Sequence, residues 1–314
     1  MAFHPLRNWY LHIAGMDGAS ASEQGCQPNA KKLHNVIKSM PENCLLSERE
    51  CLYRRVPGMT GVTHFSDKHD GGNMDQFIRT RMVLGDESMN LLSKKRVCVF
   101  GCGGVGGYVV ESLARSGIGS LDIVDGDVVD ISNLNRQIIA LHSTLGMNKA
   151  TVMEKRIHDI NPNAQVKAHG FFYDQTTAGA FDFSVYDYVV DAIDSVRDKL
   201  DIIERCVKEN VPVISSMGAG KKTDPTLFKA ADIYETSVCP LARVMRRELK
   251  KRGIRRLKVV YSTENVNAGN PAIDPPEETG KKRKLPVGSV AWIPAVAGLM
   301  LGKEVIMDLL DEKI

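Results

Sequence analysis

The sequence predicts an α/β protein built on a mainly parallel β-sheet flanked by helices, with a C-terminal α/β extension. The first observation is a short apolar strand at 96–100 that breaks directly into a glycine loop and a helix. The second is the alternation of strands and helices up to about residue 217, because parallel strands need crossover helices between them. The third is the composition, since 43% hydrophobic residues in a chain of 314 supply a sizeable core.

The first unit of this pattern predicts a nucleotide site. The strand Arg96–Phe100 is apolar, as a strand buried on both faces should be, and it leads into Gly101-Cys-Gly-Gly-Val-Gly106. Glycines permit a tight turn close to a phosphate, and the helix predicted from 105 to about 116 directs unpaired N–H groups at that anion. A second strand ends at Asp125, 19 residues after Gly106, which suits a ribose hydroxyl. A glycine-rich packing turn that binds nothing is the alternative.

The remaining segments alternate in the same way. Helices are expected at 77–92, in one or two segments, and at 147–160 and 196–208. Strands are expected at 165–169, 186–190 and 211–215. Beyond a crossing loop at 218–226, the sequence predicts an amphipathic helix at 238–252, a strand at 257–261, a polar loop at 269–284 and helix to the end.

Residues 1–73 differ from the rest, because prolines interrupt them and no hydrophobic period is sustained. We expect this part to be disordered or a non-native extension, with Met74 as the true start. Residues 74–314 are expected to form one domain. Its nucleotide half occupies about 74–217, and the remainder about 218–314.

Cysteine usage and hydropathy indicate a cytoplasmic protein without a membrane anchor. The seven cysteines form no CxxC pair, so neither a disulfide scaffold nor a four-thiolate zinc site is predicted. No secretory signal is visible at the N-terminus. The apolar stretch 287–301 is too short and too interrupted to span a bilayer, and it is expected to be a buried helix.

Polar residues beside the predicted strand ends favour ATP over a dinucleotide. Arg136 and Lys149 follow the second strand and suit the charge of a triphosphate. Asp191 and Asp194 follow a later strand, where ligands bind in parallel sheets, and a carboxylate there suits magnesium. Each has a structural alternative: the two aspartates cap the next helix, Lys149 is solvated, and Arg136 pairs with a nearby aspartate.

Five motifs resemble the adenylating core of the ubiquitin-activating-enzyme-like (ThiF/MoeB/HesA) superfamily, which has a Rossmann-like fold. These motifs are 101–106, Asp125-Gly-Asp127, 132–137, Gly146-Met-Asn-Lys149 and Asp191-Ala-Ile-Asp194. The resemblance implies that ATP is the cofactor and that Asp125 holds its ribose. The implied cofactor-binding set is Gly101, Gly103, Gly104, Gly106, Asp125, Asp127, Asn133, Arg136 and Lys149.

The same resemblance implies catalytic roles for four residues. Arg136 and Lys149 would contact the triphosphate, and Asp194 would hold Mg2+. Arg79 matches a superfamily arginine that reaches the ATP of the partner subunit, so a homodimer is implied.

Within the superfamily, further motifs resemble the subfamily that dehydrates threonylcarbamoyladenosine beside the anticodon of tRNA. They are 115–119, 135–137, 191–196, 218–220, 224–226 and 262–264. The implied activity is that of an ATP-dependent cyclising ligase, which adenylates the threonyl carboxylate and releases AMP on ring closure. Nine basic side chains between 243 and 258, with Lys281-Lys-Arg-Lys284, would hold the tRNA phosphates, or they form a solvated helix face. Whether a sulfur-relay protein is a further partner stays open.

Three alternatives remain open. An adenylating enzyme for a ubiquitin-like sulfur-carrier protein uses the same ATP site, but such relatives commonly carry CxxC pairs that this chain lacks. For that reading Cys239 is the candidate nucleophile, against the plainer interpretation of a buried thiol. An NAD-dependent oxidoreductase leaves Arg136, Lys149 and Asp194 without a role. A non-catalytic tRNA-binding protein leaves the carboxylates unexplained.

Overall fold

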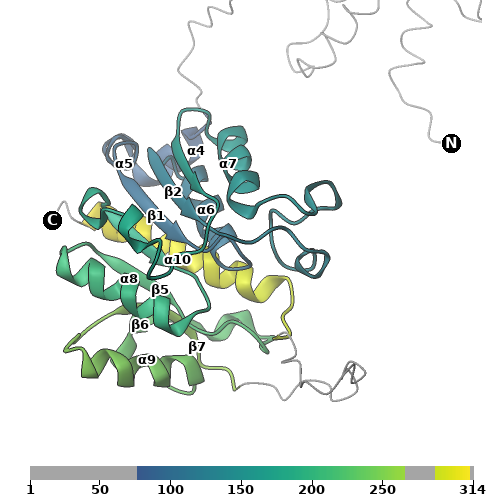
Figure 1. The fold of residues 1–314 in the computed structure, drawn as a ribbon. Helices are drawn as coiled ribbons and strands as arrows, with labels where there is room; N and C mark the ends of the chain where they lie inside the picture. Colours follow the sequence, from purple (N-terminus) through teal and green to yellow (C-terminus); the bar gives the residue numbers. More distant parts are fainter. Residues whose placement is uncertain (1–75, 266–286, 312–314) are drawn as a thin grey trace, which may run out of the picture. The chain divides into compact units, whose positions relative to one another are not determined.

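The computed structural model describes residues 76–265 and 287–311, which form an α/β fold around a seven-stranded sheet (Figure 1). The strand order is β3-β2-β1-β4-β5-β7-β6, and only β6 runs antiparallel to its neighbour. The strands are β1 Arg96–Phe100, β2 Ser120–Val124, β3 Gln165–His169, β4 Tyr188–Asp191, β5 Val213–Ser216, β6 Phe228–Asp232 and β7 Lys258–Ser262.

Seven α-helices accompany these strands in the described part of the chain. They are α4 Ile78–Leu84, α5 Asp86–Leu92, α6 Gly106–Arg115, α7 Lys149–Ile160, α8 Val196–Lys208, α9 Pro240–Lys251 and α10 Trp292–Asp311. The predicted fold class is confirmed, as are the helices and strands predicted between 77 and 261, most within a few residues of their expected bounds. The stretch 287–301, expected to be helical throughout, is a helix only from Trp292. Among these helices none is long and apolar enough to cross a bilayer.

The two faces of the sheet bury different sets of side chains. In β1, Val97 and Val99 join the core that includes side chains of α5, α6, α7 and α10. Cys98 and Phe100 point to the other face, where the 173–186 segment and α8 cover them. A third cluster joins α8 to α9 beside β7. The expectation of a strand buried on both faces is therefore confirmed.

Two parts of the predicted organisation lie outside the described residues. These are the segment 1–73 and the whole of the polar loop 269–284, including Lys281–Lys284. The strand β6 is not anticipated by the sequence pattern. Phe228-Lys-Ala-Ala-Asp232 holds four residues of low β-propensity, and it forms a strand because its backbone pairs with β7 at the edge of the sheet.

The helix α10 lies directly against α6, the helix that follows the glycine loop (Figure 1). Two glycines one turn apart in α10 make this approach possible. A Cβ atom at Gly298 would overlap the carbonyl oxygen of Val105, and one at Gly302 would overlap the hydroxyl of Ser112. The C-terminal helix thus supports the start of α6 through backbone contact, which no larger residue permits.

We expect Gly298→Val to destabilise the protein. The added side chain forces α10 away from α6 and costs about 1–3 kcal/mol, the usual effect of overpacking a close contact. Urea unfolding of the variant measures the loss. Gly179→Val is the matched control, because a Cβ there meets no atom within 4 Å. Equal unfolding midpoints for Gly298→Val and the wild type would contradict the role of this contact.

Candidate functional site

The glycine turn between β1 and α6 packs so closely against neighbouring backbone that two of its positions have no room for a side chain. Gly101 has a φ of +93°, and a Cβ there would lie 2.8 Å from the carbonyl oxygen of Ala192. A Cβ at Gly106 would overlap the carbonyl oxygen of Gly101. No side chain caps the N-terminus of α6. The turn therefore presents a helix N-terminus without a capping side chain, as an anion site requires.

Asp125 directly follows β2, and its carboxylate links the end of that strand to the glycine turn. It is buried and accepts hydrogen bonds from the N–H of Cys102 at 2.7 Å and of Asp127 at 2.9 Å. Burial raises the pKa of Asp125, and the two backbone hydrogen bonds and Lys149 oppose that rise. The carboxylate has further lone pairs beyond these two bonds, so its position suits a donor such as a ribose hydroxyl.

Lys149 and Asp127 form an ion pair beside Asp125. The ammonium of Lys149 lies 2.9 Å from Oδ2 of Asp127, and the lysine is buried although it begins α7. Asn148 caps that helix by accepting from the N–H of Thr151. Lys149 is therefore a buried, paired cation, and the alternative that it is a solvated helix residue is wrong.

Asn133 and Arg136 come from a short 3-10 segment, Ile131–Asn133, and the turn that follows it. Asn133 is buried, and its side-chain oxygen accepts from the N–H of Asp130 in a capping box. The Cγ of Arg136 lies 3.6 Å from the position of a Cβ at Gly104. The Arg136 guanidinium donates to the carbonyl of Ser132 and to Asn135 rather than to an aspartate. The structure thus brings Arg136 to the glycine turn.

The neighbouring Gln137, which ends two of the motifs named from the sequence, is a further polar residue of this site. It is buried, and its amide nitrogen lies 3.8 Å from the position of a Cβ at Gly103. Among the described residues, its Oε1 is the one buried side-chain oxygen or nitrogen without a hydrogen-bond partner. In the sequence, Gln137 is marked as a site residue by its place directly after Arg136.

Asp191 and Asp194 have different environments. Asp191 is fully buried and contacts the ammonium of Lys199 at 3.0 Å and the hydroxyl of Ser215 at 2.5 Å. Its other oxygen accepts from the N–H of Ile193 at 3.3 Å. Asp191 therefore links the ends of β4 and β5 through these partners. Of the two strand-end carboxylates that the sequence offered for magnesium, Asp191 is already engaged inside the protein.

Asp194 is exposed in the loop between β4 and α8. The two residues before it lie against Gly101, so the loop that carries Asp194 borders the glycine turn. Within residues 76–265 and 287–311, no group of three or more His, Cys, Asp or Glu residues is arranged to hold a metal.

Arg79 lies apart from these residues within one chain. It is exposed on α4, and Phe77, which precedes that helix, packs beside Gly117. Gly117 follows the C-terminus of α6, whereas the glycine turn precedes the N-terminus of that helix. Arg79 is therefore placed at the far end of α6 from the turn.

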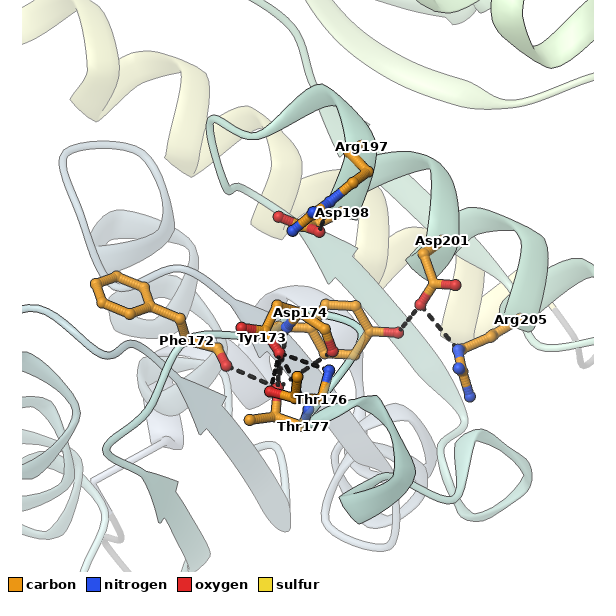
Figure 2. A network of polar contacts seen from close by, with 9 residues as sticks. All are labelled: Phe172, Tyr173, Asp174, Thr176, Thr177, Arg197, Asp198, Asp201 and Arg205. Atoms are coloured by element: carbon orange, nitrogen blue, oxygen red, sulfur yellow. Dashed lines mark hydrogen bonds and ion pairs between the residues drawn. The ribbon is translucent and has the colours of Figure 1, made fainter.

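An exposed aromatic ring, which we did not predict, lies beside Asp125. Phe172 is 59% exposed, and its ring carbons lie 2.7 Å from the position of a Cβ at Gly126. Its loop is rigid, because the hydroxyl of Thr177 donates to the carbonyl of Phe172 and Tyr173 donates to Asp201. Figure 2 shows the ring pointing away from this network. The aromatic run directly after the predicted strand 165–169 is the signal that marks it.

The crossing loop and the segment before α10 form the opposite side of the turn. Pro294 lies 3.2 Å from the position of a Cβ at Gly104. The carbonyl of Gly288 accepts from the N–H of Lys221, and the carbonyl of Ser289 accepts from Asn135. Glu264 accepts from the N–H groups of Thr223 and Asp224. The predicted subfamily motifs 224–226 and 262–264 therefore contact each other, and the motif 218–220 contacts the segment before α10, which reaches Asn135.

The cysteines of this region are buried. Cys102, within the turn, is fully buried, and burial and the negative charge of Asp125 raise the pKa of its thiol. Cys239 lies in the core between α8 and α9 at 2% exposure. Both are therefore inaccessible as nucleophiles in this structure.

The basic segment 243–258 is divided between free and paired side chains. Arg246 donates to Thr236, Arg252 pairs with Glu248 and Glu204, and Lys258 pairs with Glu304 and Asp308. Arg247 and Lys251 also pair with Glu248. The exposed cations outside all of these contacts are Arg243, Lys250, Arg255 and Arg256. The basic surface is therefore smaller than the nine residues counted in the sequence.

Parallel strands, a glycine turn and an acid after β2 together define a Rossmann-like nucleotide-binding fold. The model of the ThiF family matches residues 77–313. The chain belongs to the ThiF family.

Named relatives make the similarity more specific. The chain is 43% identical over 250 residues to a tRNA threonylcarbamoyladenosine dehydratase of Bacillus subtilis, covering 76% of this chain and 96% of that protein. It resembles the crystal structure of the Escherichia coli tRNA N6-threonylcarbamoyladenosine dehydratase in complex with ATP, with a TM-score of 0.67 at 31% identity, over 76% of this chain and 95% of that one. The adenylyltransferase and sulfurtransferase UBA4 of Vanderwaltozyma polyspora is 36% identical over 44% of this chain and 31% of its own length.

We expect Lys199→Met to destabilise the protein strongly, because it leaves the Asp191 carboxylate buried without its cation. Removal of one partner of a buried ion pair costs about 3–5 kcal/mol. Urea unfolding measures this loss. The double variant Asp191→Asn/Lys199→Met recovers much of it, because the buried charge is also removed. A single variant as stable as the wild type would contradict the assignment of Lys199 as the partner of Asp191.

Proposed function

We propose that this protein uses ATP to dehydrate threonylcarbamoyladenosine in tRNA to its cyclic form. The threonyl carboxylate attacks the α-phosphate of ATP and displaces pyrophosphate. A nitrogen of the same side chain then attacks the activated carbonyl, and AMP leaves with one carboxylate oxygen. The observation that carries this proposal is the convergence of Asp125, Arg136 and the buried Lys149 on one glycine turn, in a chain that matches such dehydratases over nearly their whole length.

The nucleotide part of the site positions ATP. In this proposal Gly101 shapes the turn, since its own N–H donates to the carbonyl of Val124, and the N–H groups at Gly103, Gly104 and Gly106 bind the phosphates. Asp125 binds the ribose. The exposed ring of Phe172 beside Gly126 offers an apolar face to the adenine. Asp127 and Asn133 contribute by holding Lys149 and the turn before Arg136 in place.

Besides positioning ATP, the site must stabilise the negative charge that develops as pyrophosphate leaves. Arg136 and Lys149 are placed to stabilise the negative charge that builds on the leaving pyrophosphate. Ring closure needs no protein nucleophile, because the attacking nitrogen and the carbonyl belong to one side chain. This matches a site whose cysteine thiols are buried.

Asp194 fits a magnesium site in which the phosphates of the bound nucleotide supply the other ligands. It is an exposed carboxylate in the loop that borders the glycine turn. Magnesium keeps several waters and is commonly held by one or two carboxylates together with phosphate oxygens, so the lack of a larger ligand cluster in the described residues is compatible with it. When bound, the ion neutralises phosphate charge.

The proposal includes partners beyond the nucleotide. The exposed cations Arg243, Lys250, Arg255 and Arg256 supply contacts for tRNA phosphates. We propose a cytoplasmic homodimer in which Arg79, at the far end of α6 from its own turn, serves the partner's ATP. A sulfur-relay protein is a further candidate partner, for which the described residues offer no dedicated feature.

The sulfur-carrier alternative is less well supported. Its chemistry commonly uses an accessible thiol, and Cys239 is buried in the core between α8 and α9. The similarity to UBA4 covers under half of this chain, whereas that to the Bacillus subtilis dehydratase covers three quarters of it. Activation of a nucleoside carboxylate is therefore the function that we favour.

We expect Asp194→Ala to abolish conversion of the modified adenosine without weakening retention of tRNA. The reason is that this carboxylate serves the nucleotide and not the RNA. Nucleoside mass spectrometry after incubation of tRNA with protein and ATP measures the product as the loss of one water. Asp159→Ala, which removes an exposed carboxylate at the end of α7, is the control and retains activity. Normal turnover by Asp194→Ala would refute the metal assignment.

A further inference from the structure

Trp292 is anchored by a hydrogen bond although half of it is exposed. It begins α10, and its indole N–H donates to the carbonyl of Thr223 at 2.8 Å. The side chain is 50% exposed, whereas the next residue, Ile293, is fully buried. One hydrogen bond thus satisfies the polar atom of the indole and fixes the ring, so that an apolar face is left open to solvent.

This indole lies at the edge of the candidate site. Two residues further along α10, Pro294 contacts the glycine turn beside Gly104. Three residues before Trp292, the carbonyl of Ser289 accepts from Asn135, whose side-chain oxygen in turn accepts from Arg136. Trp292 is therefore connected by short contacts both to the turn and to one of the cations proposed to act there.

The surroundings of Trp292 suit a polyanion that carries flat apolar groups. The crossing loop that binds the indole at Thr223 reaches the start of α9 at its other end, where Gly218 lies against Cys239. One turn further along α9, Arg243 is exposed. On the other side, Val287 is 64% exposed and contacts Gly220. An anchored aromatic face with cations on neighbouring segments is an arrangement that proteins use for unpaired nucleic-acid bases.

We propose that Trp292 is a stacking platform for an unpaired base of the substrate RNA, next to the adenosine that reacts. This inference rests on the proposed function, which requires a base in an RNA loop to leave its stack and enter the site. Stacking on the indole compensates for the lost base–base contact. Backbone phosphates of the same loop then lie near Arg243 and Arg136, so aromatic and ionic contacts act together.

Fluorescence tests this contact directly. The chain has two tryptophans, and Trp9→Phe leaves Trp292 as the sole tryptophan of an otherwise complete protein. We expect titration with an anticodon stem-loop RNA to quench the remaining emission, because a stacked base quenches indole fluorescence. ATP alone is expected to leave the emission unchanged. An RNA that binds with no change in emission would overturn the proposal.

Kinetics supply the second test. Trp292→Ala is expected to raise KM for tRNA about 5- to 100-fold, the effect of losing one base–aromatic stack, with KM for ATP unchanged. Trp292→Phe keeps a ring and is expected to retain most of the affinity. Met307→Ala, which removes an exposed apolar side chain from the other end of α10, is the matched control.

The outcomes separate this inference from the proposed function. An unchanged KM for tRNA in Trp292→Ala overturns the platform, as does a loss of dimer mass in that variant, which would make Trp292 an interface residue. If the wild type yields no dehydrated nucleoside, the proposed function fails. Quenching by the stem-loop RNA in that case still supports Trp292 as an RNA contact.

Discussion

The contact between the backbones of Gly101 and Ala192 is the constraint on which the site depends. It joins the end of β1 to the residues after β4, so the glycine turn and the loop that carries Asp194 occupy one edge of the sheet. Gly298 adds a second backbone contact, by which α10 supports the start of α6. Because both contacts lack room for a side chain, the turn is held by packing, and no side chain caps the N–H groups at the start of α6.

Polar residues beneath and beside the turn divide into those that hold the site together and those that are free to act. Asp191 and Lys199 form a fully buried ion pair that fixes β4 to β5. Asp125 accepts a hydrogen bond from the backbone of the turn and has further lone pairs for a ligand. Arg136, Asp194 and the rings of Phe172 and Trp292 remain exposed or half-exposed at its rim. The arrangement suits a reaction that demands positioning and charge rather than a protein nucleophile.

Local patterns in the sequence predicted most of the fold but only part of the site. The strand β1 and the helix α8 have the predicted bounds, because apolar spacing and flanking turn residues are local signals. The edge strand β6 escaped prediction because only its pairing with β7 makes it a strand. The sequence groups Asp191 with Asp194 as strand-end carboxylates and does not reveal the buried ion pair of Asp191, because the crossover brings its partners Lys199 and Ser215 to it. The exposure of Phe172 and Trp292 is likewise a tertiary property, and the roles of the site residues in ATP binding stay predictions.

Transfer of a labelled oxygen tests the central claim most directly, namely that a carboxylate is adenylated at the glycine turn. Threonylcarbamoyladenosine in tRNA is prepared with 18O in its carboxylate and incubated with the protein and unlabelled ATP. Adenylation followed by ring closure predicts one 18O atom in the AMP that is released and none in pyrophosphate. Label in inorganic phosphate together with ADP, or AMP without label, would contradict this account.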